Sequence, residues 1–274
     1  MKTIRLLYPD YVSGGLDTYY FGANLLAHIL PENKNQPLIK VDIAQPNSAN
    51  KIITDGIYAK GEVLSGIQNA MAKIEKENPD KIITIGGNCL VSLAPFDYLH
   101  GKYKNTGIVW IDAHPDINLP YDEYKGYHAM ALTACLGMGD EEILQLLPGK
   151  FKVSNTLIVG LRSWDEGMKE RQKNLGIKGL SPEEVAKDSS SILKWLKGTG
   201  ASKVVVHFDM DVIDPADMIA GVGVEPNGMK IDEVVRVINN IASKYDLVGL
   251  TVAEPMPRIA IKLRNMLDRL PLLK

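Results

Sequence analysis

The chain has 274 residues, 45% hydrophobic and 23% charged, which is an ordinary composition for a globular protein with a large core. Its formal net charge of −2 gives no reason to expect nucleic acid or an anionic membrane as a partner, and neither a membrane-spanning run nor a secretory signal is expected. Two cysteines, Cys89 and Cys135, offer no disulfide framework, so a reducing, cytoplasmic location is expected.

Apolar, β-branched runs alternate with segments of helical periodicity along the whole chain. In chain order, strands are predicted over Thr3–Leu7, Leu38–Ile43, Lys81–Ile85, Gly107–Ile111, Thr156–Leu161, Lys203–Phe208 and Leu247–Val252. Helices are predicted over Asp17–Leu30, Ala59–Lys76, Met130–Gly137, Asp140–Leu147, Pro182–Lys197, Ile231–Ser243 and Ile259–Leu267. Strands that alternate with helices indicate an α/β fold with a parallel sheet covered on both faces.

Two of the predicted strands end in closely spaced side chains that can bind a metal. Asp112, His114 and Asp116 follow one strand, and alternate residues of an extended chain point to the same side. Asp209 and Asp211 follow another strand, almost a hundred residues later. Aspartate is also common after strands because it forms turns. Two such clusters, one with a histidine, favour a metal site, because gathered carboxylates need a cation or protons.

The order of these motifs resembles that of the ureohydrolases, the family of arginases and agmatinases. The family patterns GGDHS, DAHxD, HG, [ST]xDxDxxDP and a late acidic residue correspond here to GGNCL at 86–90, DAHPD at 112–116, His128-Ala129, HFDMDVIDP at 207–215 and Glu254. The resemblance extends from about residue 80 to 255. It implies a single arginase-like domain over residues 1–274, with three layers and a central, mostly parallel sheet flanked by helices.

The family binds two Mn²⁺ ions that share a hydroxide, and the resemblance implies one or two such ions here. Asp112 and Asp209 would bridge the ions. His114 and Asp211 would complete one position, and Asp116 would belong to the other. A site with many carboxylates and few imidazoles suits Mn²⁺. The hydroxide, which two metals make available near neutral pH, would attack a guanidinium carbon and release urea.

Four further residues match family positions for catalysis or substrate binding. His128 matches the proton-shuttling histidine, since imidazole titrates near neutral pH. Glu254 matches the carboxylate that holds the guanidinium. Asn118 and Asp165 fall near positions that hold the carboxylate and the amino group of an amino acid. Each residue also has an ordinary structural interpretation, as a loop histidine, a strand-end acid or a turn-forming polar residue.

Cys89 departs from the family pattern, because it stands where the family has a histidine ligand next to Asp116. A thiolate is a soft ligand that favours zinc or iron, whereas a small buried cysteine often has no ligand role. In both cases the metal position that contains Asp116 is expected to be weakened. Val222 and Val224 replace residues with hydroxyl groups, and His207, in place of a small hydroxyl residue, is expected to be structural.

The sequence therefore predicts a metal-dependent hydrolase that cleaves a C–N bond of a guanidino or amidino compound, such as arginine, and releases urea. A small cationic guanidino or amidino substrate is the expected partner, and the resemblance implies a homo-oligomer. Two alternatives stay open. One is a hydrolase of the agmatinase or formiminoglutamase type, and the other is a metal-poor, catalytically silent homologue with a binding or regulatory role.

Overall fold

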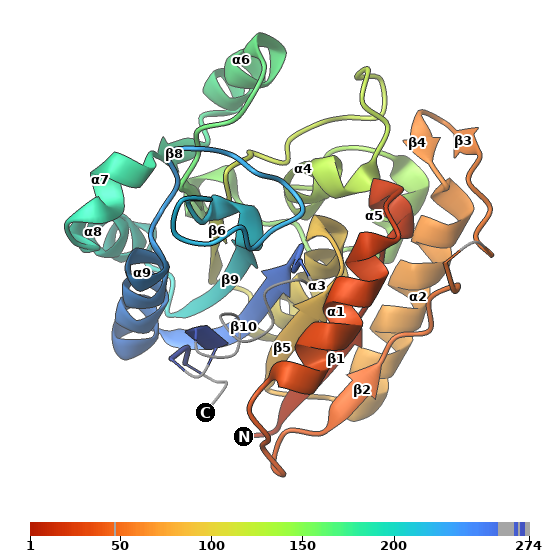
Figure 1. The fold of residues 1–274 in the computed structure, drawn as a ribbon, viewed down its shortest axis with the longest axis horizontal. Coiled ribbons are helices and arrows are strands. Elements are labelled where there is room, and N and C mark those ends of the chain that lie inside the picture. The colour runs from red at the N-terminus through yellow and green to blue at the C-terminus, as the bar shows by residue number, and fades with distance from the viewer. Residues whose placement is uncertain (47, 257–265, 268, 272–274) are drawn as a thin grey trace.

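The computed structural model describes residues 1–46, 48–256, 266–267 and 269–271. In this part of the chain an eight-stranded sheet forms the middle of the molecule (Figure 1), with the order β2-β1-β5-β10-β9-β6-β7-β8 and every pair parallel. Its strands are β1 (Thr3–Tyr8), β2 (Leu38–Lys40), β5 (Lys81–Gly86), β6 (Thr106–Ile111), β7 (Thr156–Val159), β8 (Lys178–Leu180), β9 (Lys203–Asp209) and β10 (Asp246–Ala253). A separate antiparallel hairpin joins β3 (Ile53–Thr54) and β4 (Ile57–Tyr58).

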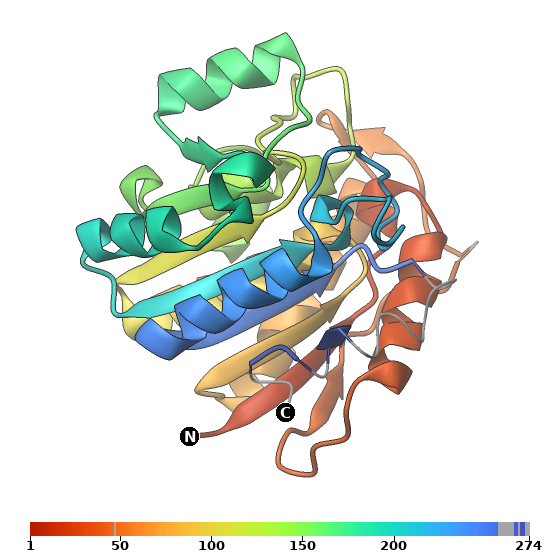
Figure 2. The same ribbon diagram turned by 60° about the vertical axis from the view of Figure 1, so that its left-hand side comes forward.

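Helices cover both faces of the sheet, as Figure 2 shows. The α-helices are α1 (Thr18–Ile29), α2 (Lys60–Glu77), α3 (Leu93–Tyr103), α4 (Ala131–Cys135), α5 (Glu141–Leu146), α6 (Glu166–Leu175), α7 (Pro182–Ala186), α8 (Ser190–Thr199) and α9 (Ile231–Lys244). Successive strand residues point to opposite faces, so Ile82 and Ile83 of β5 enter different hydrophobic clusters. Residues of α2, α3, α4 and α5 belong to the first cluster, and residues of α1, α7, α8 and α9 belong to the second. This arrangement confirms the predicted three-layer α/β fold.

All seven predicted strands are present, but two are shorter than predicted, since β7 ends at Val159 instead of Leu161 and β2 is shortened as well. β2 ends at Lys40 instead of Ile43. It is an edge strand, and beyond it the amide of Asp42 donates to the side chain of Asn69 in α2 at 2.8 Å. The backbone at this point therefore bonds to a helix instead of extending the ladder.

Helix boundaries differ more from the predictions. The helix predicted over Pro182–Lys197 is two helices, α7 and α8, and the side chain of Asp188 accepts from the amide of Ser190 at the start of the second. The predicted segments Met130–Gly137 and Asp140–Leu147 contain the shorter α4 and α5. The predicted helix Ile259–Leu267 lies, except for its last two residues, outside the described residues.

Two helices were not predicted, for different reasons. α3 contains Pro95 and Gly101, which weaken a helical pattern, but the proline lies in the first turn, where its missing amide costs little. α6 buries none of its residues, so it lacks an apolar stripe. No helix in the described part of the chain is long and apolar enough to cross a membrane.

Candidate active site

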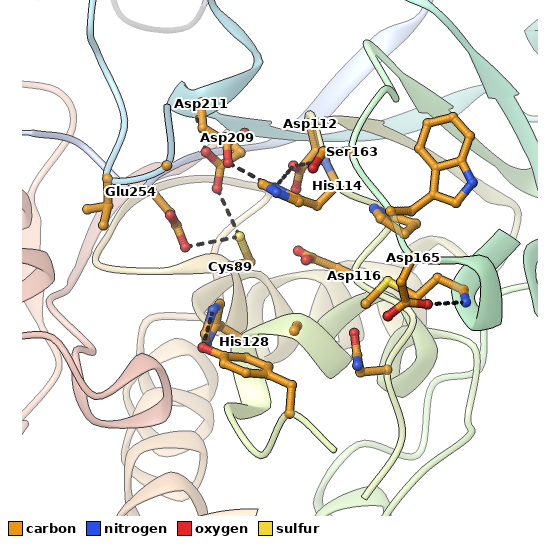
Figure 3. A pocket seen from close by; sticks show the side chains of 18 of the residues that line it. Cys89, Asp112, His114, Asp116, His128, Ser163, Asp165, Asp209, Asp211 and Glu254 are labelled. Atoms are coloured by element: carbon orange, nitrogen blue, oxygen red, sulfur yellow. Dashed lines mark hydrogen bonds and ion pairs between the residues drawn. The ribbon is translucent and has the colours of Figure 1, made fainter. Parts of the chain in front are cut away.

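A cavity of about 600 Å³ lies beyond the carboxyl ends of four neighbouring strands, β5, β10, β9 and β6 (Figure 3). This is the edge at which parallel α/β sheets bind ligands. All ten residues predicted from the sequence to act in the site line this cavity, namely Cys89, Asp112, His114, Asp116, Asn118, His128, Asp165, Asp209, Asp211 and Glu254. Tyr19, Trp164 and Met168 line it as well. Sequence reasoning missed these three because an isolated aromatic or apolar residue carries no spacing signal.

The segment after β6 forms a tight turn around the side chain of Asp112. Its Oδ1 accepts from the amide of His114 at 2.7 Å, and its Oδ2 accepts from the indole nitrogen of Trp110 at 3.0 Å. The turn brings Nδ1 of His114 to 2.9 Å from Oδ2 of Asp211 and 3.6 Å from Oδ1 of Asp112. These three residues can hold one cation between them.

The end of β9 repeats the same local geometry. Oδ1 of Asp209 accepts from the amide of Asp211 at 2.7 Å, and the amide of Ala113 donates to Oδ1 of Asp211 at 3.3 Å. The second contact links the two strand ends directly. The two sequence motifs therefore form neighbouring walls of one site.

Two site carboxylates belong to residues with a left-handed backbone, Asp116 with φ of 49° and Glu254 with φ of 56°. Such a conformation costs about 1–3 kcal/mol and persists where surrounding contacts impose it. Here the amide of Leu132 donates to the carbonyl of Asp116 at 3.0 Å, and the amide of Glu254 donates to the carbonyl of Gly87 at 2.7 Å. The fold thus holds both carboxylates in place at a cost in backbone energy.

The cavity floor concentrates negative charge. Five acidic residues, each at most 5% exposed, gather there, namely Asp112, Asp116, Asp209, Asp211 and Glu254. Among the described residues, none of them forms an ion pair with a lysine or arginine side chain. Burial, reinforced by neighbouring carboxylates, raises the pKa of Asp112 and raises the pKa values of Asp116 and Asp209 well above the ordinary range.

His114 is the cationic partner of this cluster in the metal-free protein. Burial opposes its protonation, but hydrogen bonds and charge from Asp112 and Asp211 raise its pKa to about 12. In return, His114 lowers the pKa of Asp211 in spite of its burial. Protonated His114 therefore offsets part of the carboxylate charge, and neutral His114 would become a ligand on metal binding.

Three groups of side chains have ligand atoms within 4.8 Å of one another. They are Asp112, His114 and Asp211; Cys89, Asp209 and Glu254; and Cys89, Asp112, Asp116 and His207. Oδ2 of Asp116 and Nε2 of His207 are buried without a hydrogen-bond partner. A bound cation would neutralise the carboxylates and would bind these two unpartnered atoms. The residues therefore fit a metal centre.

Cys89 lies within this cluster, as Figure 3 shows. Its Sγ is 2.9 Å from Oδ2 of Asp209 and 3.7 Å from Oε1 of Glu254. The preceding Asn88 fixes the loop, because it accepts from the amide of Leu90 at 3.2 Å and donates to Oδ2 of buried Asp10 at 2.8 Å. Burial and the surrounding carboxylates raise the pKa of the thiol, so Cys89 is a thiol when no metal is bound.

His128 stands at the side of the cavity, where it is partly exposed. Its Nδ1 is 3.2 Å from the carbonyl oxygen of Ser13, and its Nε2 is 3.3 Å from the hydroxyl of Tyr124. Nδ1 therefore carries the proton and Nε2 is the basic nitrogen. Burial lowers the pKa of His128 to about 4, with His114 adding to the effect, so the ring is neutral at pH 7.

The remaining predicted residues, Asn118 and Asp165, also line the cavity. Asn118 is buried, and its Oδ1 has no hydrogen-bond partner. Oδ1 of Asp165 accepts from the amide of Met168 at 2.7 Å and caps α6, so this residue has a structural role at the cavity wall. Val222 lines the cavity, whereas Val224 is 49% exposed. Oε1 of Glu225, the residue that follows Val224, is 3.7 Å from Nε2 of His114.

A parallel α/β sheet with buried carboxylate and histidine groups at its carboxyl edge defines a metal-binding α/β enzyme. The sequence model of the arginase family matches residues 31–266. The chain therefore belongs to the arginase family, whose members are metal-dependent hydrolases.

Individual relatives agree with this assignment. The chain is 25% identical to the arginase of Saccharomyces cerevisiae over 241 residues, 81% of this chain and 72% of that protein. It spans about half the length of the arginase of Staphylococcus aureus, at 27% identity over 147 residues, 52% of this chain and 49% of that protein.

Solved structures share the fold. The arginase of Entamoeba histolytica in complex with L-ornithine superposes with a TM-score of 0.84 at 20% identity, covering 97% of this chain and 96% of that one. A formimidoylglutamase of Bacillus subtilis superposes with a TM-score of 0.72 at 14% identity, covering 97% and 85%.

Proposed function

We propose that the chain hydrolyses a C–N bond of a small guanidino or amidino compound, with arginine, which would yield urea, as the first candidate. The observation that carries the proposal is the meeting of five buried carboxylates, His114, His128 and an unpaired amide oxygen in one cavity of small-ligand size. A negatively charged floor favours a cationic substrate.

In this proposal, one metal position has the ligands Asp112, His114 and Asp211. The other has Asp116 and Asp209, and Cys89 stands there in place of the family's histidine. Asp112 belongs to two of the candidate ligand groups, and the family resemblance implies that Asp209 is likewise shared by the two positions. Mn²⁺ is the proposed metal of the first group, since its donors are mainly carboxylate oxygens. When bound, the metal would supply hydroxide at neutral pH.

Glu254 is the proposed anchor of the substrate cation. Its carboxylate lies at the cavity floor, where a guanidinium can donate two parallel hydrogen bonds. His128 is the proposed proton carrier, because its neutral ring presents a basic Nε2 that can take up a proton and pass it to the leaving amine.

Asn118 and Asp165 are the proposed contacts for the distal end of an amino-acid substrate. The unpartnered Oδ1 of Asn118 offers a hydrogen-bond acceptor, and its amide nitrogen can donate to a carboxylate. Asp165 keeps one oxygen on the α6 cap, so a single carboxylate oxygen would meet an amino group.

A substrate panel tests the proposal. Protein loaded with Mn²⁺, Co²⁺, Ni²⁺ or Zn²⁺ is incubated with arginine, agmatine, guanidinobutyrate, formiminoglutamate or guanidine, and urea, formamide and ammonia are measured. Release of urea from arginine supports arginase activity. Turnover of agmatine or formiminoglutamate supports a hydrolase of the agmatinase or formiminoglutamase type instead. If no compound is cleaved, the chain is a silent homologue with a binding or regulatory role.

Three broader expectations are part of the same proposal. We propose that residues 1–274 form one domain, since eight strands, the first β1 and the last β10, share one sheet. We also propose a cytoplasmic homo-oligomer, based on the cysteine content and on the family resemblance. Light scattering of the purified protein gives its mass in solution, and a monomeric mass would refute the oligomer.

A further inference from the structure

We propose that Cys89 and His207, together with Asp112 and Asp116, form a zinc-selective position in the metal centre. This inference deepens the proposed function and rests on its metal centre. It assigns a ligand role to His207, which the sequence predicts to be structural. It also changes the expected occupant of the position that contains Asp116 from Mn²⁺ to Zn²⁺.

The four side chains are arranged as a compact donor set. One ligand atom from each lies within 4.8 Å of all the others, and each residue is at most 5% exposed. In a tetrahedral zinc site with bonds of about 2.0–2.3 Å, ligand atoms are about 3.3–3.8 Å apart. A contraction of about 1 Å therefore closes the set around an ion.

His207 presents an unsatisfied nitrogen to this set. The residue is 0% exposed, its Nε2 has no hydrogen-bond partner, and that atom is 3.8 Å from Oδ2 of Asp112. Its other nitrogen, Nδ1, is 2.8 Å from the hydroxyl of Ser92. A hydrogen bond that occupies one ring nitrogen and leaves the other for the metal is the usual arrangement of a metal-bound histidine.

The sheet holds the imidazole in this orientation. His207 of β9 pairs with Trp110 of β6, and the two rings stack with centroids 3.7 Å apart at an interplanar angle of 11°. His207 and Asp209 lie on the same face of β9, as do Trp110 and Asp112 on β6. The ring therefore lies directly beneath the carboxylates. A purely structural histidine at this depth would leave a buried nitrogen without a hydrogen bond, which is energetically unfavourable.

The chemistry of the donors selects the metal. One thiolate, one imidazole and two carboxylates form a mixed set that suits Zn²⁺, whereas the neighbouring group of Asp112, His114 and Asp211 has no sulfur donor and suits a harder ion. The Cys89 thiol, which now donates to Asp209, would lose its proton on metal binding. The chain thus replaces a lost imidazole at position 89 with an imidazole at position 207.

Cobalt spectroscopy tests the thiolate ligand without any measurement of turnover. Metal-free protein is titrated with Co²⁺, which gives a charge-transfer absorption band in the near ultraviolet when a thiolate binds it. The band is expected in the unmodified protein and in Cys135→Ser, which alters the other buried cysteine, and is expected to be absent in Cys89→Ser. A missing band in the unmodified protein, or one that persists in Cys89→Ser, overturns the inference.

Competition titrations test His207. The ratio of the Mn²⁺ to the Zn²⁺ dissociation constant for the first equivalent is expected to fall at least tenfold in Cys89→Ser and in His207→Gln. His100→Gln, which alters a partly buried histidine outside the site, is expected to keep the ratio. An unchanged ratio in folded His207→Gln overturns the ligand role of His207.

If His207→Gln does not fold, X-ray absorption decides. The measurement uses His114→Ala, because this variant leaves His207 as the one histidine in the candidate ligand groups. One equivalent of Zn²⁺ should then show one sulfur neighbour at about 2.3 Å and one imidazole. A spectrum with oxygen neighbours only overturns the inference. Failure of the proposed function is separate, since a cobalt–thiolate band without turnover overturns the hydrolase alone, and turnover with Mn²⁺ without a band overturns the zinc position alone.

Discussion

Replacing Glu254 with glutamine should stabilise the metal-free protein at alkaline pH. Glu254 is 5% exposed and belongs to a cluster of buried carboxylates without lysine or arginine partners among the described residues. Burial, with added repulsion from Asp211 and Asp112, raises its pKa from 4.5 to about 8. The Glu254→Gln substitution keeps the size of the side chain and its left-handed backbone, and removes only the ionisable group.

The sign and size follow from proton linkage. Because the pKa is raised in the folded state, the native protein holds a proton that the unfolded chain releases between pH 4.5 and about 8. The free energy of unfolding therefore falls as pH rises across this window, by about 1.4 kcal/mol per pH unit for one group. If Glu254 titrated alone, the full pKa shift from 4.5 to about 8 would change the free energy of unfolding by about 5 kcal/mol. Neighbouring carboxyls share protons with Glu254, so we expect a gain of about 2–3 kcal/mol at pH 8.5.

Urea denaturation of protein treated with EDTA, at pH 4.5 and pH 8.5, measures this gain. The substitution should have little effect at pH 4.5, and addition of Mn²⁺ should reduce the gain at pH 8.5, because a cation stabilises the ionised carboxylate. Glu75→Gln, a change on the exposed side of α2, is the matched control. Equal pH slopes for Glu254→Gln and the unmodified protein would refute the view that the cluster is destabilised by its own charge.

Three further substitutions test the catalytic role, the core and the loop behind the site. His128→Gln should lower kcat about 10²–10⁴-fold and change KM little, because proton transfer belongs to the transition state; steady-state kinetics with a changed KM alone would contradict this. Burial raises the pKa of Asp97 to about 6. Asp97→Asn should therefore be about 2 kcal/mol more stable than the unmodified protein at pH 7.5 but not at pH 4. Urea denaturation that shows no gain at pH 7.5 would contradict this. Gly87→Ala should lower the free energy of unfolding by more than about 3 kcal/mol, because a Cβ there would lie 1.8 Å from the carbonyl oxygen of Asp10. Gly101→Ala, with open space around it, is the control. Equal melting temperatures of the two variants in thermal melts would refute the clash.

The fold was predictable because most of its strands are buried on both faces. Continuous apolar runs such as that of β9 follow directly from a sheet covered by helices, and all seven predicted strands exist. Two of the elements that the sequence did not predict lack such a burial signal. β8 has three residues at the sheet edge, and α6 buries none. The hairpin of β3 and β4 did carry a sequence signal, because the dipeptide Asp55-Gly56 is typical of a two-residue turn. Both residues have the positive φ values that such a turn needs.

The site was predictable where side chains follow strand ends at fixed spacing. The motifs around Asp112 and Asp209 are local, and the parallel sheet brings them together. The ligand role proposed for His207 could not be predicted from the sequence, because its neighbours come from other segments of the chain. Only the pairing of β6 with β9 places it beside Trp110, and only the loop after β5 brings Ser92 to its Nδ1 and Cys89 to its neighbourhood. No spacing along the chain encodes that meeting.

The same features that reveal the site also make it costly to fold. Asp116 and Glu254 have left-handed backbones, five buried carboxylates repel one another, and two buried donor atoms in the cluster lack partners. A bound cation reduces the second and third of these costs, because it neutralises the carboxylates and binds the two unpartnered ligand atoms. Metal binding and folding are therefore coupled, and the free energy of unfolding should rise with the logarithm of one plus the ratio of free metal concentration to the dissociation constant. A sequence that kept these carboxylates without binding any cation would carry the whole cost with no compensating term, and this argues for an occupied centre.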